Sequence, residues 1–252
     1  GSLNVGGTEK QLLKIINYLA KKNWEIELIT LKEKGILAKY LNKKIKVNNL
    51  NIKVSFKFVR LFKIIFKLLK IFKKNPYTLT HFFLPQAYIL GMASSIIANT
   101  KCKLIMSRRS LNFYQNKFFF YRTIEKFLHQ KINKILVNSE AIKKQLINQE
   151  GVSKNKIKII YNGVEAKNNK KFKKNNNFNI VIIANLIPYK NHHILFNSLN
   201  LIKEKLPKNW KIYCIGRDDG IKKNLIKLLV KLNLLFLTTS FHYQLNLLHH
   251  NF

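Results

Sequence analysis

Several residues of this chain have the types and positions needed to bind an anionic ligand. Gly6 and Gly7 stand directly before a helical pattern of apolar residues, and Lys190 follows Pro188 at the start of another. Backbone N–H groups at a helix start can receive a phosphate, and a lysine there can stabilise charge developing on phosphate oxygens. The alternative for the glycine pair is an ordinary tight turn.

A second group of candidates stands at predicted strand ends. Arg108 and Arg109 are adjacent, directly after a strand pattern, and they are two of only five arginines. Open α/β sheets bind ligands at this edge, so we predict an anion site there. His81 also lies near a strand end and is a candidate for catalysis, although most single histidines are structural. No pair of carboxylates has a spacing suited to acid–base hydrolysis.

The elements that would position these residues alternate between strand and helix. Strand patterns cover residues 25–31, 45–54, 77–83, 103–106, 134–138, 157–161, 180–184 and 210–215. Helical patterns cover residues 8–22, 56–74, 87–98, 118–131, 139–148, 191–205 and about 220–233. This order predicts α/β domains with parallel sheets and right-handed crossovers.

The alternation is interrupted once, which predicts two domains. We expect a first domain over 1–163, a lysine- and asparagine-rich linker over 164–177 and a partial second domain over 178–234. Only three residues precede the turn at Asn4, so we expect a first strand to be missing. Residues 235–252 contain no Lys, Arg, Asp or Glu. We interpret this tail as a shifted reading frame or a false end, because its histidines match no defined metal site.

The formal charge of +36 allows two interpretations. It is typical of proteins that bind nucleic acid, anionic membrane or phosphorylated ligands. However, Lys and Asn both have A/T-rich codons, and a protein selected to grip phosphodiesters would favour Arg over Lys. Cys102 and Cys214 lie far apart in apolar runs and are interpreted as core residues rather than a disulfide. We find no signal peptide and no apolar run near 20 residues.

The helix predicted over 56–74 is basic and amphipathic. Arg60, Lys63, Lys67, Lys70 and Lys74 fall at steps of three or four and form one stripe, whereas Phe62 and Phe66 are among the apolar residues that fill the rest. Such a helix can lie on an anionic membrane. It can equally be a crossover helix with one buried face and a solvated lysine stripe.

Six stretches in order resemble landmarks of glycosyltransferase family 4, whose members have the GT-B fold. They are NVGGTEKQLLKIINYLAKKNWEIELITL, THFFLPQAYILGMAS, IMSRRSLNFYQ, ILVNSEAIKKQLI, KIKIIYNGVE and IANLIPYKNHHIL. The resemblance covers about residues 4–233. It implies two Rossmann-like domains, the second incomplete, and a nucleotide-sugar donor bound in the cleft between them. It also implies transfer with retention of configuration, usually without a metal.

The resemblance assigns roles to single residues. Gly6 and Gly7 match the glycine loop beside the donor phosphates, Lys190 matches the lysine on the diphosphate, and Gly216 matches the glycine near the base. Asn185 replaces an arginine of many members, and Arg108 or Arg109 could supply that cation. His81 could substitute for a family histidine whose place is taken by Ser107. The two-glutamate motif that holds the donor sugar has no counterpart here, so we expect this 252-residue chain to be inactive.

We therefore expect a retaining glycosyltransferase of hexosyltransferase type that acts on a glycan or lipid-linked acceptor in cell-surface polysaccharide synthesis. It would need no metal and no cofactor beyond its donor. We expect it in the cytoplasm, with the inner membrane face as a second location, reached through residues 56–74. The alternative is a non-catalytic basic protein for nucleic acid or anionic lipid, but lysines spread through every segment favour no specific nucleic acid. A dinucleotide enzyme is disfavoured because Gly6-Gly7 lacks the G-x-G-x-x-G spacing.

Overall fold

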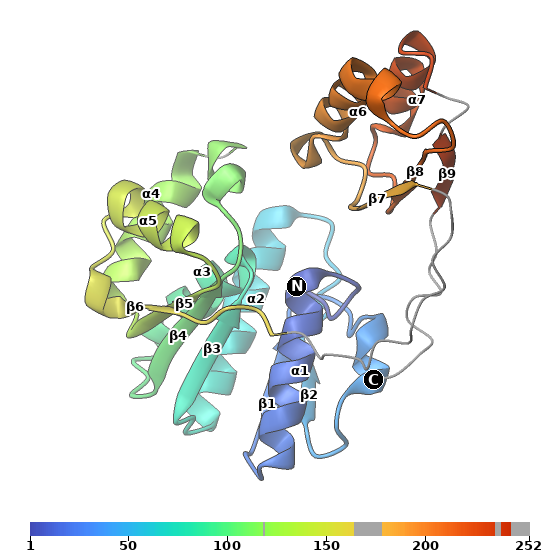
Figure 1. Ribbon diagram of the computed structural model, residues 1–252. Coiled ribbons are helices and arrows are strands. Elements are labelled where there is room, and N and C mark those ends of the chain that lie inside the picture. Colours follow the sequence, from blue (N-terminus) through green and yellow to red (C-terminus); the bar gives the residue numbers. More distant parts are fainter. Residues whose placement is uncertain (118, 164–177, 235–237, 243–252) are drawn as a thin grey trace. The chain divides into compact units, whose positions relative to one another are not determined.

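The computed structural model describes residues 1–117, 119–163, 178–234 and 238–242 (Figure 1). The chain divides into two compact units, Gly1–Glu165 and Ala166–Phe252, which we call unit 1 and unit 2. Both units have the α/β architecture that the sequence predicted, with helices packed on parallel sheets. The predicted linker 164–177 and residues 243–252, which include His249 and His250, lie outside the described residues.

Unit 1 contains two parallel sheets. β1 (Glu27–Thr30) pairs with β2 (Lys46–Asn49). The larger sheet has the order β3-β4-β5-β6, and its strands are β3 (Leu79–Phe83), β4 (Lys103–Arg108), β5 (Lys134–Val137) and β6 (Ile157–Ile159). All neighbours are parallel, so the carboxyl ends of the four strands meet at one edge.

The described residues of unit 1 form five α-helices, of which α1 precedes β1 and the other four connect successive strands from β2 to β6. They are α1 (Gly7–Lys21), α2 (Lys57–Lys74), α3 (Pro85–Ile97), α4 (Phe119–Lys131) and α5 (Glu140–Glu150). Short 3₁₀ turns occur at Ile36–Tyr40, Asn112–Lys117 and Lys154–Lys156. The α1 helix packs Ile16 and Ala20 against β1 and β2, beside which it runs (Figure 1). None of the described helices is both long and apolar enough to cross a lipid bilayer.

Local signals explain where some helices begin and end. Ser139 caps α5 by accepting a hydrogen bond from the Ile142 N–H, and Gly151 ends the helix in the left-handed region (φ 69°) that favours glycine. The N-cap of α1 is Gly6, so Thr8 lies inside the helix. The β4 strand extends two residues beyond the predicted end at Met106, which places Ser107 and Arg108 within the sheet.

The described residues of unit 2 form one parallel sheet of order β7-β8-β9. Its strands are β7 (Asn179–Ile183), β8 (Lys211–Ile215) and β9 (Thr238–His242), and its helices are α6 (His192–Ile202) and α7 (Lys222–Lys231). Short 3₁₀ turns occur at Pro188–Lys190 and Lys203–Lys205. Phe196, Trp210 and Leu229 are among its core residues. The β9 strand comes from the segment predicted to be anomalous, and it pairs with β8.

Candidate functional site

The carboxyl edge of the four-stranded sheet brings together two of the predicted site residues. His81 in β3 lies with its Nε2 atom 2.9 Å from the Ser107 hydroxyl in β4. Arg109, directly after β4, donates a hydrogen bond to the side-chain oxygen of Asn162, which follows β6. The charge of Arg109 also acts on His81, so we group the two hydrogen-bonded pairs as one polar cluster at three strands of this sheet. Ser107 and Asn162 complete this edge cluster.

The protonation of His81 is set by its surroundings. Burial, and next the positive charge of Arg109, lower the pKa of His81 to about 4. Its ring also lies 4.2 Å from the Phe83 ring, measured between centroids. At neutral pH the imidazole is therefore uncharged, and it can exchange a hydrogen bond with Ser107 or with a ligand hydroxyl.

The start of α1 is tied to the same region of unit 1. The Gln11 side-chain amide donates to the carbonyl of Gly163, with 3.3 Å between the two atoms. The candidates Gly6 and Gly7 lie about one turn earlier, at the amino end of α1. A Cβ added at Gly7 would meet open space, whereas one at Gly6 would meet the carboxylate of Glu9. The amino end of α1 favours an anion because of the helix dipole. The Glu9 carboxylate already lies next to Gly6 at this end.

Arg108 differs from Arg109 in its burial and in its hydrogen-bond partners. Its side chain is 3% exposed and leaves β4 on the face opposite to Ser107, as strand alternation requires. The two terminal nitrogens donate to Glu125 at 3.0 Å and to Glu150 at 2.9 Å. In this arrangement Arg108 cannot contact a ligand, so the cation role proposed for either arginine passes to Arg109. The physical reason is that β4 extends through Arg108 and turns its side chain inward.

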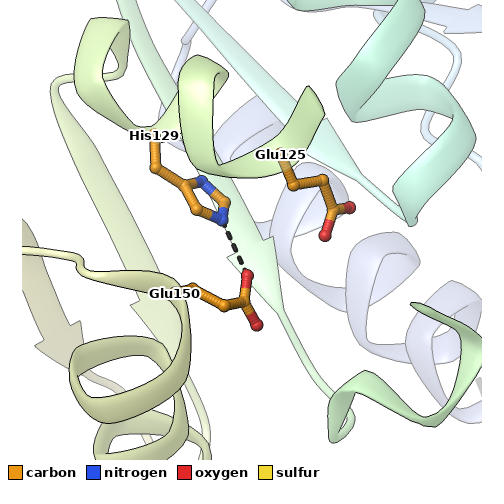
Figure 2. Close-up of side chains that lie close together, drawn as sticks. All are labelled: Glu125, His129 and Glu150. Carbon is orange, nitrogen blue, oxygen red and sulfur yellow. Dashed lines mark hydrogen bonds and ion pairs between the residues drawn. The ribbon is translucent and has the colours of Figure 1, made fainter. Parts of the chain in front are cut away.

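The two carboxylates belong to a larger buried network. Glu150 accepts from His129 Nε2 at 2.9 Å, the contact drawn in Figure 2, and His129 Nδ1 lies 2.8 Å from the Tyr88 hydroxyl. Glu125 also accepts from Tyr114 and Gln115. Burial would raise the pKa of Glu150, but the hydrogen bond from His129 and the charge of Arg108 outweigh it and hold the pKa below its usual range. The network joins α3, α4, α5 and β4.

Glu125, His129 and Glu150 also have a set of donor atoms that could hold a metal ion. One ligand atom from each lies within 4.8 Å of the others (Figure 2). However, Arg108 already supplies a cation to both carboxylates, and both nitrogens of His129 already have partners. A metal ion would have to displace the guanidinium. We therefore interpret the network as an internal ion-pair cluster that fixes the helices to β4.

In unit 2 the polar residues gather where β7 and β8 end. The Asn185 side chain donates to Asp219 at 3.2 Å and accepts from the Arg217 backbone N–H at 3.3 Å. The Arg217 guanidinium is bonded to Asp219, with 2.7 Å between Nε and Oδ1. Hydrogen bonds from Arg217 and then Asn185 contribute to a lowered pKa of Asp219, so this exposed carboxylate is ionised at neutral pH.

Gly216 has a structural reason to be glycine. A Cβ at this position would collide with the Ala184 carbonyl, because the loops after β7 and β8 approach each other closely there. The hydrogen bond from the Leu186 N–H to the Arg217 carbonyl, 2.8 Å long, joins the same two loops. Gly216 therefore permits the contact that brings Asn185 next to Arg217.

Lys190 lies on the connection between β7 and α6, five residues after Asn185. It is exposed, it ends the 3₁₀ turn Pro188–Lys190, and its ammonium lies 5.6 Å from the centroid of the Tyr189 ring. Asn191 then adopts the left-handed conformation (φ 56°) and α6 begins at His192. Lys190, Asn185 and Gly216 thus belong to unit 2, while Gly6, Gly7, His81 and Arg109 belong to unit 1.

Sequence reasoning missed two features. Arg217 was passed over although it directly follows Gly216 and is one of five arginines. The buried network was missed as well, although Glu125 and His129 stand at i and i+4 on one predicted helix. Glu125 is also the only acidic residue between Glu33 and Glu140, a signal that it serves a specific partner in so basic a chain.

Comparison with known proteins gives a consistent result. The sequence model of Glycosyltransferase Family 4 matches residues 5–168. No curated protein matches the sequence significantly. Among solved structures, the apo lipopolysaccharide outer core galactosyltransferase WaaB is similar with a TM-score of 0.70 and 16% identity, covering 95% of this chain and 65% of its own.

Two further structures show the same fold. Anabaena Alr3699/HepE, solved in complex with UDP, has a TM-score of 0.68 and 18% identity over 94% of this chain and 66% of its own. A glycosyltransferase from Rickettsia africae ESF-5 has a TM-score of 0.68 and 19% identity over 97% of this chain and 68% of its own. The chain thus spans about two thirds of the length of these proteins.

Proposed function

The chain belongs to Glycosyltransferase Family 4, and we propose that the complete protein transfers a sugar from a nucleotide-sugar donor to a glycan or lipid-linked acceptor. The observation that carries this proposal is the family match over residues 5–168. The Anabaena protein with the same fold, solved with UDP and with UDP-glucose, supports a nucleotide-sugar as the donor class. We further propose a hexosyltransferase that acts with retention in cell-surface polysaccharide synthesis, in the cytoplasm.

In the proposed reaction, the charge that must be stabilised develops on the leaving group. The bond between sugar C1 and the diphosphate oxygen breaks, the acceptor hydroxyl oxygen bonds to C1, and the acceptor proton passes to the diphosphate. Negative charge therefore develops on phosphate oxygens. Lys190, exposed just before α6, and Arg217, at the end of β8, are the cations of unit 2 that we assign to this charge. Since these cations can stabilise the leaving group, we propose that no metal is needed.

The remaining candidates receive roles from their places in the fold. Gly216 allows the loop after β8 to pass close to Asn185, and we assign both to the nucleotide side of the donor. In unit 1 we assign the edge cluster of His81, Ser107, Arg109 and Asn162 to the transferring sugar and acceptor. The neutral imidazole of His81 suits a hydrogen bond to a sugar hydroxyl, because burial keeps it uncharged at neutral pH.

The donor assignment can be tested by titrating UDP into this chain. We expect Lys190→Ala to weaken binding at least about tenfold, since a hydrogen bond to a charged group contributes about 1.5–3 kcal/mol. Lys208→Ala is the matched control, because Lys208 is exposed and precedes the amino end of β8, at the opposite edge of the sheet. Equal affinities for the wild type and Lys190→Ala would refute the role of Lys190.

The transfer itself needs an assay of the complete protein. Radiolabelled nucleotide-sugars with lipid-linked acceptors should give product in the presence of EDTA, and NMR of the product should show the anomeric configuration of the donor. Hydrolysis of the donor with no transfer to any acceptor, or activity abolished by EDTA and restored by a divalent metal, would contradict the proposal.

A further inference from the structure

Helix α2 leaves a row of phenylalanines in solvent. Its buried face consists of Ile64, Leu68 and Phe72, which join the main core of unit 1. The opposite side exposes Phe58 (77%), Phe62 (73%) and Phe66 (58%). Because a helix repeats every 3.6 residues, positions 58, 62 and 66 lie on one line along its surface. We call these three side chains the phenylalanine ridge.

Lysines border the ridge on one side. Lys63, Lys67 and Lys70 are exposed on the adjacent strip of the helix, and the Lys70 ammonium lies 4.6 Å from the centroid of the Phe66 ring. Phe62 and Phe66 of the ridge and this lysine border line one side of a shallow hollow whose other side is the segment 51–54. The crossover interpretation of the helix therefore explains only the buried face. The exposed face combines hydrocarbon with positive charge.

The sequence around α2 has no acidic residue to balance this charge. None of the residues between Glu33 and Glu125 is Asp or Glu, a span that includes all of α2 and both neighbouring connections. A partner for this face must therefore be anionic and must also accept exposed aromatic rings. A second copy of the chain is a poor partner, because each copy carries a net charge of +36.

We propose that α2 docks this protein on an anionic lipid bilayer, with the phenylalanine ridge in the acyl boundary and the lysine border at the phosphate level. Lysines bury their carbon stems beside apolar surface while their ammonium groups reach outward, which suits this depth. Arg60 is the only arginine of α2. A surface selected for nucleic-acid phosphates would favour arginine, because its guanidinium can bind a phosphate through two hydrogen bonds. The inference rests on the surface of unit 1 alone and does not depend on the donor site of unit 2.

The test is co-sedimentation of the whole chain with sucrose-loaded vesicles of phosphatidylcholine, with and without 30 mol% phosphatidylglycerol as a chosen probe composition. We expect tight binding to the anionic vesicles and binding at least about tenfold weaker to the neutral ones, since several lysines act near the surface. The triple variant Phe58→Ser, Phe62→Ser, Phe66→Ser should bind anionic vesicles at least about tenfold more weakly, because it loses most of the inserted apolar area. Circular dichroism checks that the variants remain folded, as exposed sites should allow.

Two matched controls keep the outcome specific. The first replaces three exposed apolar residues elsewhere, Tyr18, Trp24 and Leu201, by Ser. The second compares Lys63→Gln, Lys67→Gln, Lys70→Gln with the same change at Lys208, Lys211 and Lys223, which conserves net charge between the two variants. We expect only the α2 variants to lose binding. Equal losses in both lysine variants with no effect of the Phe→Ser changes would indicate a general polycation and overturn the proposal.

Insertion can be measured separately from attraction. Phe62→Trp should give a blue-shifted emission with anionic vesicles, quenched by brominated acyl chains, while the wild type with Trp24 and Trp210 supplies the background spectrum. An unshifted, unquenched signal from the introduced tryptophan would overturn the proposal. So would binding to RNA that is as tight as to vesicles and is equally weakened by the Phe→Ser changes, because the ridge would then serve nucleobases.

Discussion

Two neighbouring arginines, the last residue of β4 and the residue directly after it, have opposite environments. On one face Arg108 is enclosed and bonded to two carboxylates from α4 and α5. Directly after β4, Arg109 is half-buried and bonded to one amide side chain at the sheet edge. The first arrangement pairs the charge with two buried carboxylates and closes it to ligands, although the Arg108 Nε has no hydrogen-bond partner among the described residues. The second leaves most of the hydrogen-bonding groups of the guanidinium open.

The difference teaches that adjacency in sequence is poor evidence for a shared site. Arg108 is the last residue of β4 and points into the core, whereas Arg109 follows the strand and lies at its edge. The buried member fixes the helices behind the sheet, while the edge member can act on a ligand. With the role proposed for Arg109, stability and ligand binding depend on neighbouring residues, so each can be changed on its own.

The largest effect is expected from Arg108→Ala. Removing one partner of a buried ion pair typically costs about 3–5 kcal/mol, because the remaining charges lose their compensation. Here Glu125 and Glu150 would face each other without a cation, so we expect a loss at the upper end of that range in the free energy of unfolding of unit 1. Urea denaturation, monitored by hydrogen exchange of the β4 and β5 amides, measures this loss in the free energy of unfolding. A loss below about 1 kcal/mol would contradict the claim that the buried ion pairs of Arg108 stabilise unit 1.

The next effect concerns pH and the edge face. His81 has a folded-state pKa of about 4 against 6.5 for the ordinary group. Between these values the unfolded chain binds more protons, so unit 1 loses stability as the pH falls from about 6.5 towards 4. We expect His81→Gln to remove roughly 1–2 kcal/mol of the stability difference between pH 7 and pH 5. Parallel urea titrations at both pH values test this, and an unchanged pH dependence in the variant would contradict it.

An effect of similar size is expected from Tyr88→Phe in the buried network around Arg108. The Tyr88 side chain is fully buried and its hydroxyl lies 2.8 Å from His129 Nδ1, so the change leaves a buried ring nitrogen without its partner. We expect a loss of about 1–2 kcal/mol in the free energy of unfolding. Tyr189→Phe is the control, because Tyr189 is exposed. Equal stability of Tyr88→Phe and the wild type would mean that the network does not need this hydrogen bond.

Much of the fold could be predicted from the sequence, for a physical reason. Apolar runs such as Ile135–Val137 in β5 and periodic patterns such as that of α2 record burial directly. The alternation of such elements then fixes parallel pairing. The site was harder to predict, because the end of a strand decides which way a side chain points. An error of two residues at the end of β4 was enough to place Arg108 with Arg109.

The partners of polar residues are the part that no local pattern contains. Glu150 meets Arg108 across 42 positions, and Arg217 meets Asn185 across 32. Both contacts depend on how the elements pack, which a single sequence does not record. The exposure of the Phe62 and Phe66 side chains could not be predicted from the sequence for a related reason. The sequence shows that α2 is amphipathic, but it does not show how wide the buried face is.

The smallest and most discriminating effect is expected from Arg109→Ala. We expect a loss below about 1 kcal/mol in the free energy of unfolding, because this side chain is partly solvated and its one amide partner, Asn162, is exposed. The positive charge of Arg109 helps to lower the pKa of His81, so removing it should raise that pKa. NMR titration of the His81 ring measures the change, and Arg122→Ala on α4 is the matched control that should leave it unaltered. If Arg109→Ala destabilised unit 1 as much as Arg108→Ala does, both arginines would be equally important for stability. The contrast between the buried Arg108 and the edge residue Arg109 would then be wrong.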